Sequence, residues 1–218
     1  MFRAVLYSQW KWSRLVIAVG TVVAFAIPVL SVQGTTQSSA SPLRTGEILR
    51  LVQSWGVLYP ALAGALGLLV AMATWAPDHR GRHVHALSLP LPRWRYVLLR
   101  FGAGLVLLAP PVAALFTGAV LATRLTVIPA GLEAYPVALT IRFAIAVVVA
   151  FAIFFAISAG TTRTAGVILA TLGAIIAVQI LASAADIHLD LLTPLQIAMQ
   201  NWPGPLAIFT GRWMLIDV

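Results

Sequence analysis

The fold of this chain is decided by stretches such as residues 101–123, FGAGLVLLAPPVAALFTGAVLAT, which contain no charged side chain. A run of about 20 apolar residues forms a helix long enough to cross a hydrocarbon core of about 30 Å. Four further runs of this kind lie at about 15–32, 56–76, 143–160 and 164–185. We therefore predict an all-α, polytopic integral membrane protein, a helical bundle with about five complete spans.

The composition of the whole chain supports this class. Of its 218 residues, 61% are hydrophobic and 9% are charged, and its mean hydropathy is +0.96. A soluble domain carries roughly a quarter of its residues as charges, so this chain cannot cover a water-facing surface. The net charge of +8 would suit nucleic acid, but no soluble basic domain exists to bind it. We predict one transmembrane domain over residues 1–218 and no nucleic-acid partner.

Both ends of the chain carry shorter segments beside the spans. Residues 1–14, MFRAVLYSQWKWSR, place Arg3, Tyr7, Lys11 and Arg14 on one helical face, which predicts a helix lying at the membrane interface. The alternative is a plain basic start to the first span. Residues 186–205 are predicted to form an outer-face segment. The run 203–216 is too short for a span, and we interpret it as the start of a partial sixth.

The basic residues predict the orientation, because cytoplasmic loops are enriched in Lys and Arg. With the N-terminus inside, nine Lys and Arg side chains fall on the cytoplasmic side and five on the outer side. We therefore predict a multi-pass protein of the cell membrane, plasma or inner, with a cytoplasmic N-terminus.

Several kinds of chemistry have no support in the sequence. Its one Lys, Lys11, follows no glycine-rich turn, so the chain lacks the phosphate-binding loop of many ATPases. There is no Cys, and Arg80 stands where a His79–His83 metalloprotease motif needs Glu. We predict no catalytic residue, no metal and no cofactor in this chain, hence no enzyme. A small intramembrane enzyme stays open as an alternative.

Two patterns concern helix packing. Ala63, Gly67 and Ala71 form a small-xxx-small stripe in the second span, which favours close approach of another helix. Pro110 and Pro111 in the third span predict a kink, because proline removes a backbone donor.

The charge of the chain is concentrated in the segment 77–96, between the second and third spans. Pro77-Asp78 is typical of a helix start, with Asp78 as the N-cap. Val84, Leu87 and Leu91 recur near helical spacing, and Pro92 suits the first turn of the next helix. This order predicts a short cytoplasmic helix joined to two spans. An ordinary basic loop is the alternative.

The same segment resembles the cytoplasmic segment of type-2 ABC transporter permeases. Asp78-x-x-Gly81 is followed by ALSLPLPRWRYVLLR at 86–100, similar to the D…G…L.LP..R stretch of that family. The matching positions are Asp78, Gly81, Leu87, Leu89, Pro90, Arg93 and Arg100. The resemblance implies a coupling segment that docks on a separate ATPase subunit, and our predicted contact residues are Asp78, Gly81, Val84, Leu87, Leu89, Pro90 and Arg93.

The resemblance also implies the function and the partners. The chain would be the permease subunit of an ATP-driven exporter, paired with a second permease chain, identical or different, and embedded in membrane lipid. ABC-type ATPase subunits would hold the ATP and Mg²⁺. The alternative from another class is a membrane scaffold or assembly subunit that transports nothing.

Overall fold

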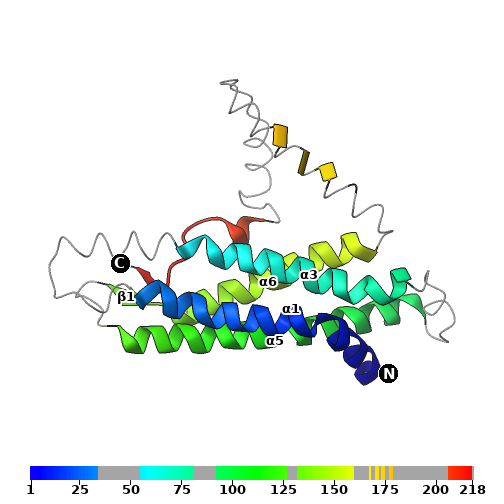
Figure 1. Ribbon diagram of the computed structural model, residues 1–218, viewed down its shortest axis with the longest axis horizontal. Coiled ribbons are helices and arrows are strands. Elements are labelled where there is room, and N and C mark those ends of the chain that lie inside the picture. The colour runs from blue at the N-terminus through cyan, green and yellow to red at the C-terminus, as the bar shows by residue number, and fades with distance from the viewer. Residues whose placement is uncertain are drawn as a thin grey trace. The chain divides into compact units, whose positions relative to one another are not determined.

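The computed structural model describes residues 1–33, 55–80, 92–126, 132–159 and 206–217, and isolated helical positions between 167 and 178. Four long helices dominate it: α1 (Phe2–Gln33), α3 (Leu58–Arg80), α5 (Arg93–Leu125) and α6 (Pro136–Ala159). Figure 1 shows them side by side along one direction. The short elements are β1 (Glu133–Ala134), the 3-10 turn η1 (Ala207–Phe209) and β2 (Ile216–Asp217).

All four helices are long and apolar enough to cross a membrane. Their stretches Phe2–Val32, Leu58–Asp78, Trp94–Leu125 and Pro136–Ala159 overlap the first four predicted runs. The predicted membrane-embedded helical class is therefore confirmed, with four candidate spans in the described part of the chain. The fifth run, 164–185, and the outer segment 186–205 lie outside the continuously described residues, so the count of five stays a prediction.

The helices alternate in direction. Gln9 of α1 bonds to Arg100 of α5, and Phe25 of α1 lies against Gly118 of α5, so these two helices run parallel. Gly67 and Trp75 of α3 meet Ala150 and Phe155 of α6, so this second pair is also parallel. Asp78 of α3 pairs with Arg100 of α5, which sets the two pairs antiparallel. Such an alternation is what successive membrane spans require.

Small residues set the distances between the helices. A Cβ atom added to Gly67 would lie 2.5 Å from the Ala150 Cβ, so the backbones of α3 and α6 touch there. Ala63 and Ala71, one turn to each side, are fully buried. The predicted stripe therefore does form a helix contact. Without a hydrophobic drive between helices in lipid, this close packing is a main source of their association.

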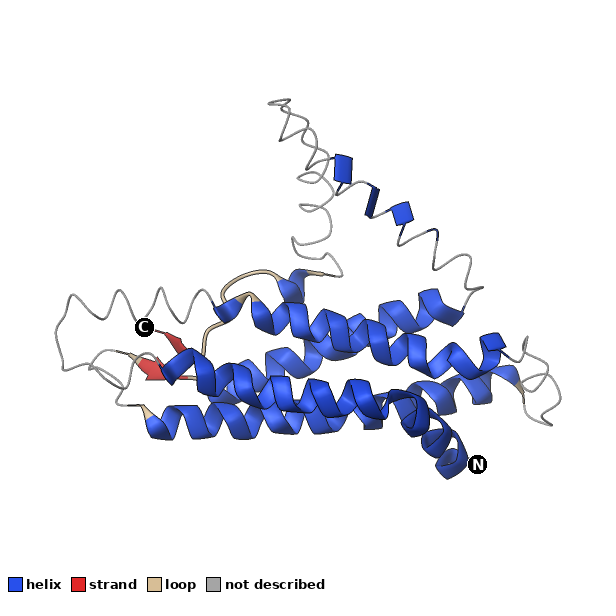
Figure 2. Ribbon diagram, viewed as in Figure 1, coloured by secondary structure: helices blue, strands red, loops and turns tan. Residues whose placement is uncertain are grey.

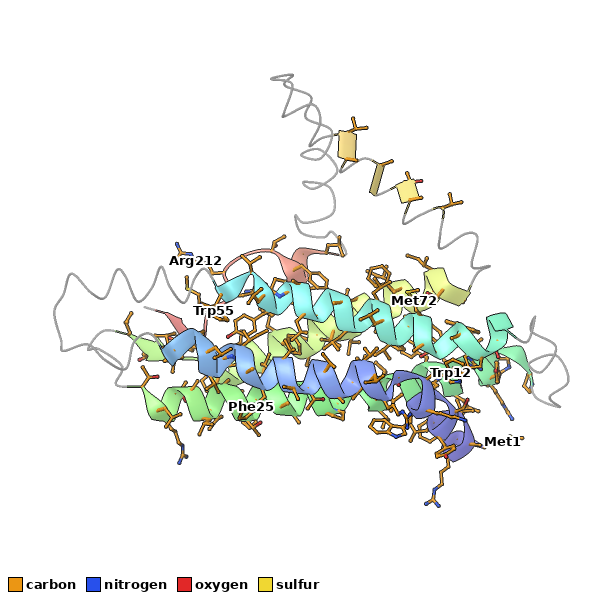
Figure 3. All side chains as sticks on the ribbon, in the orientation of Figure 1. Met1, Trp12, Phe25, Trp55, Met72 and Arg212 are labelled. Atoms are coloured by element: carbon orange, nitrogen blue, oxygen red, sulfur yellow. The ribbon has the colours of Figure 1, made fainter. Side chains whose placement is uncertain are left out.

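Two sequence predictions about α1 and α5 are refined. Residues 1–14 and 15–32 form one helix, which at about 1.5 Å per residue is about 48 Å long, more than a bilayer core needs. Its first turns leave the axis of the rest near Trp12 (Figure 3). In α5 the helix continues through Pro110 and Pro111; the predicted kink stays untested.

The prediction for the end of the chain is wrong. Residues 206–217 do not begin a sixth helical span: they form η1, a stretch without regular secondary structure, and β2. β2 pairs antiparallel with β1, with Glu133 opposite Asp217 and Ala134 opposite Ile216, as Figure 2 shows beside the end of α1. The physical reason is that backbone pairing and the burial of Trp213, Leu215 and Ile216 hold Arg212–Asp217 against the bundle.

Candidate functional site

The candidate site is a buried polar cluster where α3 ends and α5 begins, which we call the 78–100 clamp. It consists of Asp78 and Thr74 from α3, Tyr96 and Arg100 from α5, and Gln9 from α1. The segment 81–91 connects α3 to α5 and lies outside the described residues. The clamp therefore joins α3, which precedes this segment in the chain, to α5, which follows it.

An ion pair forms the centre of the clamp. Arg100 Nη2 lies 2.8 Å from Asp78 Oδ1, and the side chains are 8% and 3% exposed. The Tyr96 hydroxyl donates to the same carboxylate, 3.1 Å from each oxygen. Arg100 Nη1 donates to the backbone carbonyl of Thr74. A buried, hydrogen-bonded charge pair tolerates little change of geometry, because losing one partner leaves the other charge unpaired.

Aromatic rings and α1 complete the surroundings of Arg100. Its guanidinium carbon lies 5.3 Å from the ring centre of Trp75 and 4.9 Å from that of Tyr96, distances at which a cation is attracted to a ring face. Gln9 Nε2 donates to the Arg100 carbonyl at 3.1 Å. Arg100 of α5 is thus held by contacts from α1 and α3, and its position ties the first turns of α1 to the clamp.

The structure corrects the sequence interpretation of Asp78. We predicted it as the N-cap of a cytoplasmic helix, but it lies inside the last turn of α3, which continues through Pro77. The reason is tertiary: its carboxylate is used by Tyr96 and Arg100 rather than by free amide groups. Of the predicted segment 77–96, the first residues, through Arg80, belong to α3, and those from Arg93 onward belong to α5. The side chain of Asp78 is buried, and its predicted role in coupling stays a prediction.

The other predicted coupling residues fall in two places. Gly81, Val84, Leu87, Leu89 and Pro90 lie outside the described residues, and their role stays a prediction. Arg93 is the first residue of α5. Sequence analysis missed Thr74, Tyr96 and Gln9 as members of the clamp. The one available signal was Arg100, which we gave only as a position matching the permease segment, although it lies about two turns inside α5.

The clamp joins the end of α3 to the start of α5 through a paired carboxylate and guanidinium. Its carboxylate and guanidinium neutralise each other, and the described residues contain no group of three or more side chains that would hold a metal. Arg100 Nε and Gln9 Oε1 have no hydrogen-bond partner within the described ranges. What the arrangement does is fix the separation and rotation of α3 and α5 where they flank 81–91.

A search of protein-family models, curated proteins and solved structures finds no match to this chain.

Proposed function

We propose that this protein is a membrane permease subunit driven by a separate ATPase, as its resemblance to type-2 ABC transporter permeases implies. In this proposal the N-terminus is cytoplasmic, in the plasma or inner membrane, and the segment 81–91 receives the ATPase. The cargo leaves the cell or the bilayer as the bundle changes shape. The chain contributes no ATP-hydrolysing residue of its own.

The observation that carries the proposal is the buried ion pair between Asp78 and Arg100. A loop that merely connects two spans does not need both of its ends fixed by a buried, hydrogen-bonded charge pair, which is costly to bury. A segment that transmits force does need this, since otherwise a push on it would bend the loop. With the clamp closed, a displacement of 81–91 moves α3 and α5 together.

The clamp also reaches the rest of the bundle. Trp75 Nε1 donates to the Phe155 carbonyl of α6 at 3.2 Å. Phe101 of α5 stacks on Phe151 and meets Phe155 edge to face. Gln9 brings in α1. All four helices are therefore in contact at this end, which supports transmission from one cytoplasmic segment to every candidate span.

The proposal is tested by purifying the tagged full chain from its native membrane and identifying its partners. We expect an ATPase with a G-x-x-x-x-G-K-[ST] loop. Replacing 81–91 by a Gly/Ser segment of equal length should abolish its recovery, while membrane insertion is kept. The control replaces 127–131, at the other end of α5, in the same way, and should retain the ATPase.

Two results would contradict the proposal. One is the absence of any ATPase beside the intact chain in native membranes. The other is full recovery of the ATPase with the 81–91 replacement. Stable recovery of other membrane proteins without an ATPase would favour the scaffold function instead.

A further inference from the structure

The first turns of α1 run across α5 instead of along it. Gln9 bonds to the carbonyl of Arg100, and the Phe2 ring lies beside Gly102, where an added Cβ would be 3.9 Å from Phe2 Cε2. Between residues 2 and 9, α1 advances about 10 Å, but between residues 100 and 102, α5 advances only about 3 Å. The segment is therefore strongly inclined to the bundle, as Figure 1 shows at the N-terminus.

One face of this crosswise segment is exposed and cationic. Gln9 and Ser13 face the bundle and are buried, while Arg3, Lys11 and Arg14 are exposed. Trp10, on the same turns, is 44% exposed. Together these side chains present positive charge and an aromatic ring at the level where the apolar part of the bundle ends.

The start of α5 adds a second exposed group that also combines positive charge with an aromatic ring. Arg95 is exposed, and its guanidinium carbon lies 5.1 Å from the ring centre of Trp94, which is 60% exposed. Arg100 positions both pieces, because it belongs to α5 and holds Gln9 of α1. We call the surface formed by Arg3, Trp10, Lys11, Arg14, Trp94 and Arg95 the N-terminal collar.

Within the described residues, no exposed carboxylate near the N-terminal collar neutralises its positive charges. The one carboxylate that the described ranges place at this end is Asp78, which is 3% exposed and paired with Arg100. The collar therefore offers several cations to whatever lies against it, at the boundary between apolar helices and water.

We propose that the N-terminal collar binds the phosphate headgroups of anionic phospholipids in the leaflet next to it. Lys and Arg near the membrane surface attract anionic lipid, and exposed Trp side chains prefer the headgroup level. A crosswise basic helix with a buried opposite face is suited to lie there. This inference does not depend on the proposed transport function, because it concerns only the described residues at the end of the bundle.

The experiment measures lipid retention by the purified full chain. The chain is incubated in detergent with an equimolar mixture of phosphatidylglycerol and phosphatidylcholine, and bound lipids are counted by native mass spectrometry. We expect phosphatidylglycerol to be retained in excess. Substituting Arg3→Gln, Lys11→Gln and Arg14→Gln together should bring the ratio of bound phosphatidylglycerol to phosphatidylcholine close to that of the mixture. Each removed charge should lower the preference for phosphatidylglycerol by at most about five-fold.

Matched variants separate the collar from net charge. Arg124→Gln removes one exposed positive charge near the end of α5, away from the collar, and should leave the ratio unchanged, whereas Arg14→Gln should lower it. Arg14→Lys keeps the charge and should keep the preference. These single variants decide the question even if the triple variant does not fold.

The proposal is overturned if Arg14→Gln and Arg124→Gln lower phosphatidylglycerol retention equally, since net charge alone would then explain it. It is also overturned if the triple variant keeps the wild-type ratio. Loss of a co-purifying protein with an unchanged lipid ratio would show that the collar is a protein-docking surface instead.

Discussion

The two ends of the bundle are held together by different interactions. At the N-terminal end, the 78–100 clamp fixes α1, α3 and α5 through one buried ion pair and the hydrogen bonds around it. At the opposite end, the segment Arg212–Asp217 returns to the bundle from elsewhere in the chain. Figure 3 shows Met1 and Arg212 at these two ends.

Aromatic stacking and backbone pairing dominate the opposite end. Trp213 is 4% exposed, and its ring stacks on Tyr59 of α3 with centroids 6.4 Å apart. The Arg142 guanidinium carbon lies 4.5 Å above the same ring, and Arg142 Nη1 donates to the Arg212 carbonyl at 2.6 Å. The Tyr135 amide donates to the Leu215 carbonyl at 2.9 Å. This end is closed by a segment distant in sequence, whereas the clamp closes the other end with neighbouring helices.

This difference has a consequence for topology. Phe155, near the end of α6, lies beside Trp75 and Phe101 near the clamp, and Arg212 lies at the opposite end of the bundle. If the two ends lie on opposite sides of a membrane, the chain between them crosses it an odd number of times, as one span at 164–185 would do.

The largest expected effect is therefore an all-or-none labelling pattern. Because the chain has no Cys, single Cys substitutions at Arg212, Arg124 and Arg95 can be compared directly in intact cells. We expect an impermeant thiol reagent to modify the Cys at 212 and the Cys at 124 in intact cells, and the Cys at 95 only after the cells are permeabilised. Labelling of 212 together with 95, and not with 124, would refute a single crossing.

The next largest effect is expected at the clamp. Asp78→Ala leaves the Arg100 charge buried without its partner, which should lower the free energy of unfolding by about 3–5 kcal/mol. The measurement is denaturant titration in detergent, followed by helical circular dichroism. The double variant Asp78→Leu with Arg100→Met replaces both charges by apolar groups and should recover most of the loss. A double variant less stable than Asp78→Ala would show that the ion pair is not the source of the effect.

A smaller effect is expected at the opposite end. Trp213→Ala removes the stacking on Tyr59 and the contact with Arg142, and a buried Trp→Ala change costs about 3 kcal/mol or more in a closed core. Here the loss should be local, so the readout is hydrogen exchange of the Tyr135 amide, which should become much faster. Met214→Ala, at the less buried neighbour, is the control. Equal exchange rates in the two variants would contradict a closure centred on Trp213.

The sequence could predict the features that depend on local patterns, but not the contacts that close the two ends of the bundle. The four spans were predictable, because each is a local run of apolar residues whose meaning does not depend on its neighbours. The stripe through Gly67 was predictable for the same reason. Asp78 was expected to be the N-cap of a cytoplasmic helix and Arg100 only a position matching the permease segment, since a sequence does not tell which charges are buried together. The role of Trp213 depends on Tyr59 and Arg142, which lie 154 and 71 positions away, and no local pattern connects them.

The smallest effect compares one tyrosine hydroxyl from each end. Tyr96→Phe removes the hydroxyl that donates to Asp78 in the part-buried clamp, and hydrogen bonds to charged groups contribute about 1.5–3 kcal/mol. Because Tyr96 is partly exposed, we expect a loss of about 1.5 kcal/mol. Tyr135→Phe removes the same group from an exposed bond to Glu133 at 3.0 Å, where the change should stay within about 0.5 kcal/mol. Both are measured by the denaturant titration used for Asp78→Ala. Losses of equal size would mean that the Tyr96 hydrogen bond to Asp78 contributes no more stability than the exposed bond of Tyr135 to Glu133. The contrast between the two ends would then rest on the ion pair alone.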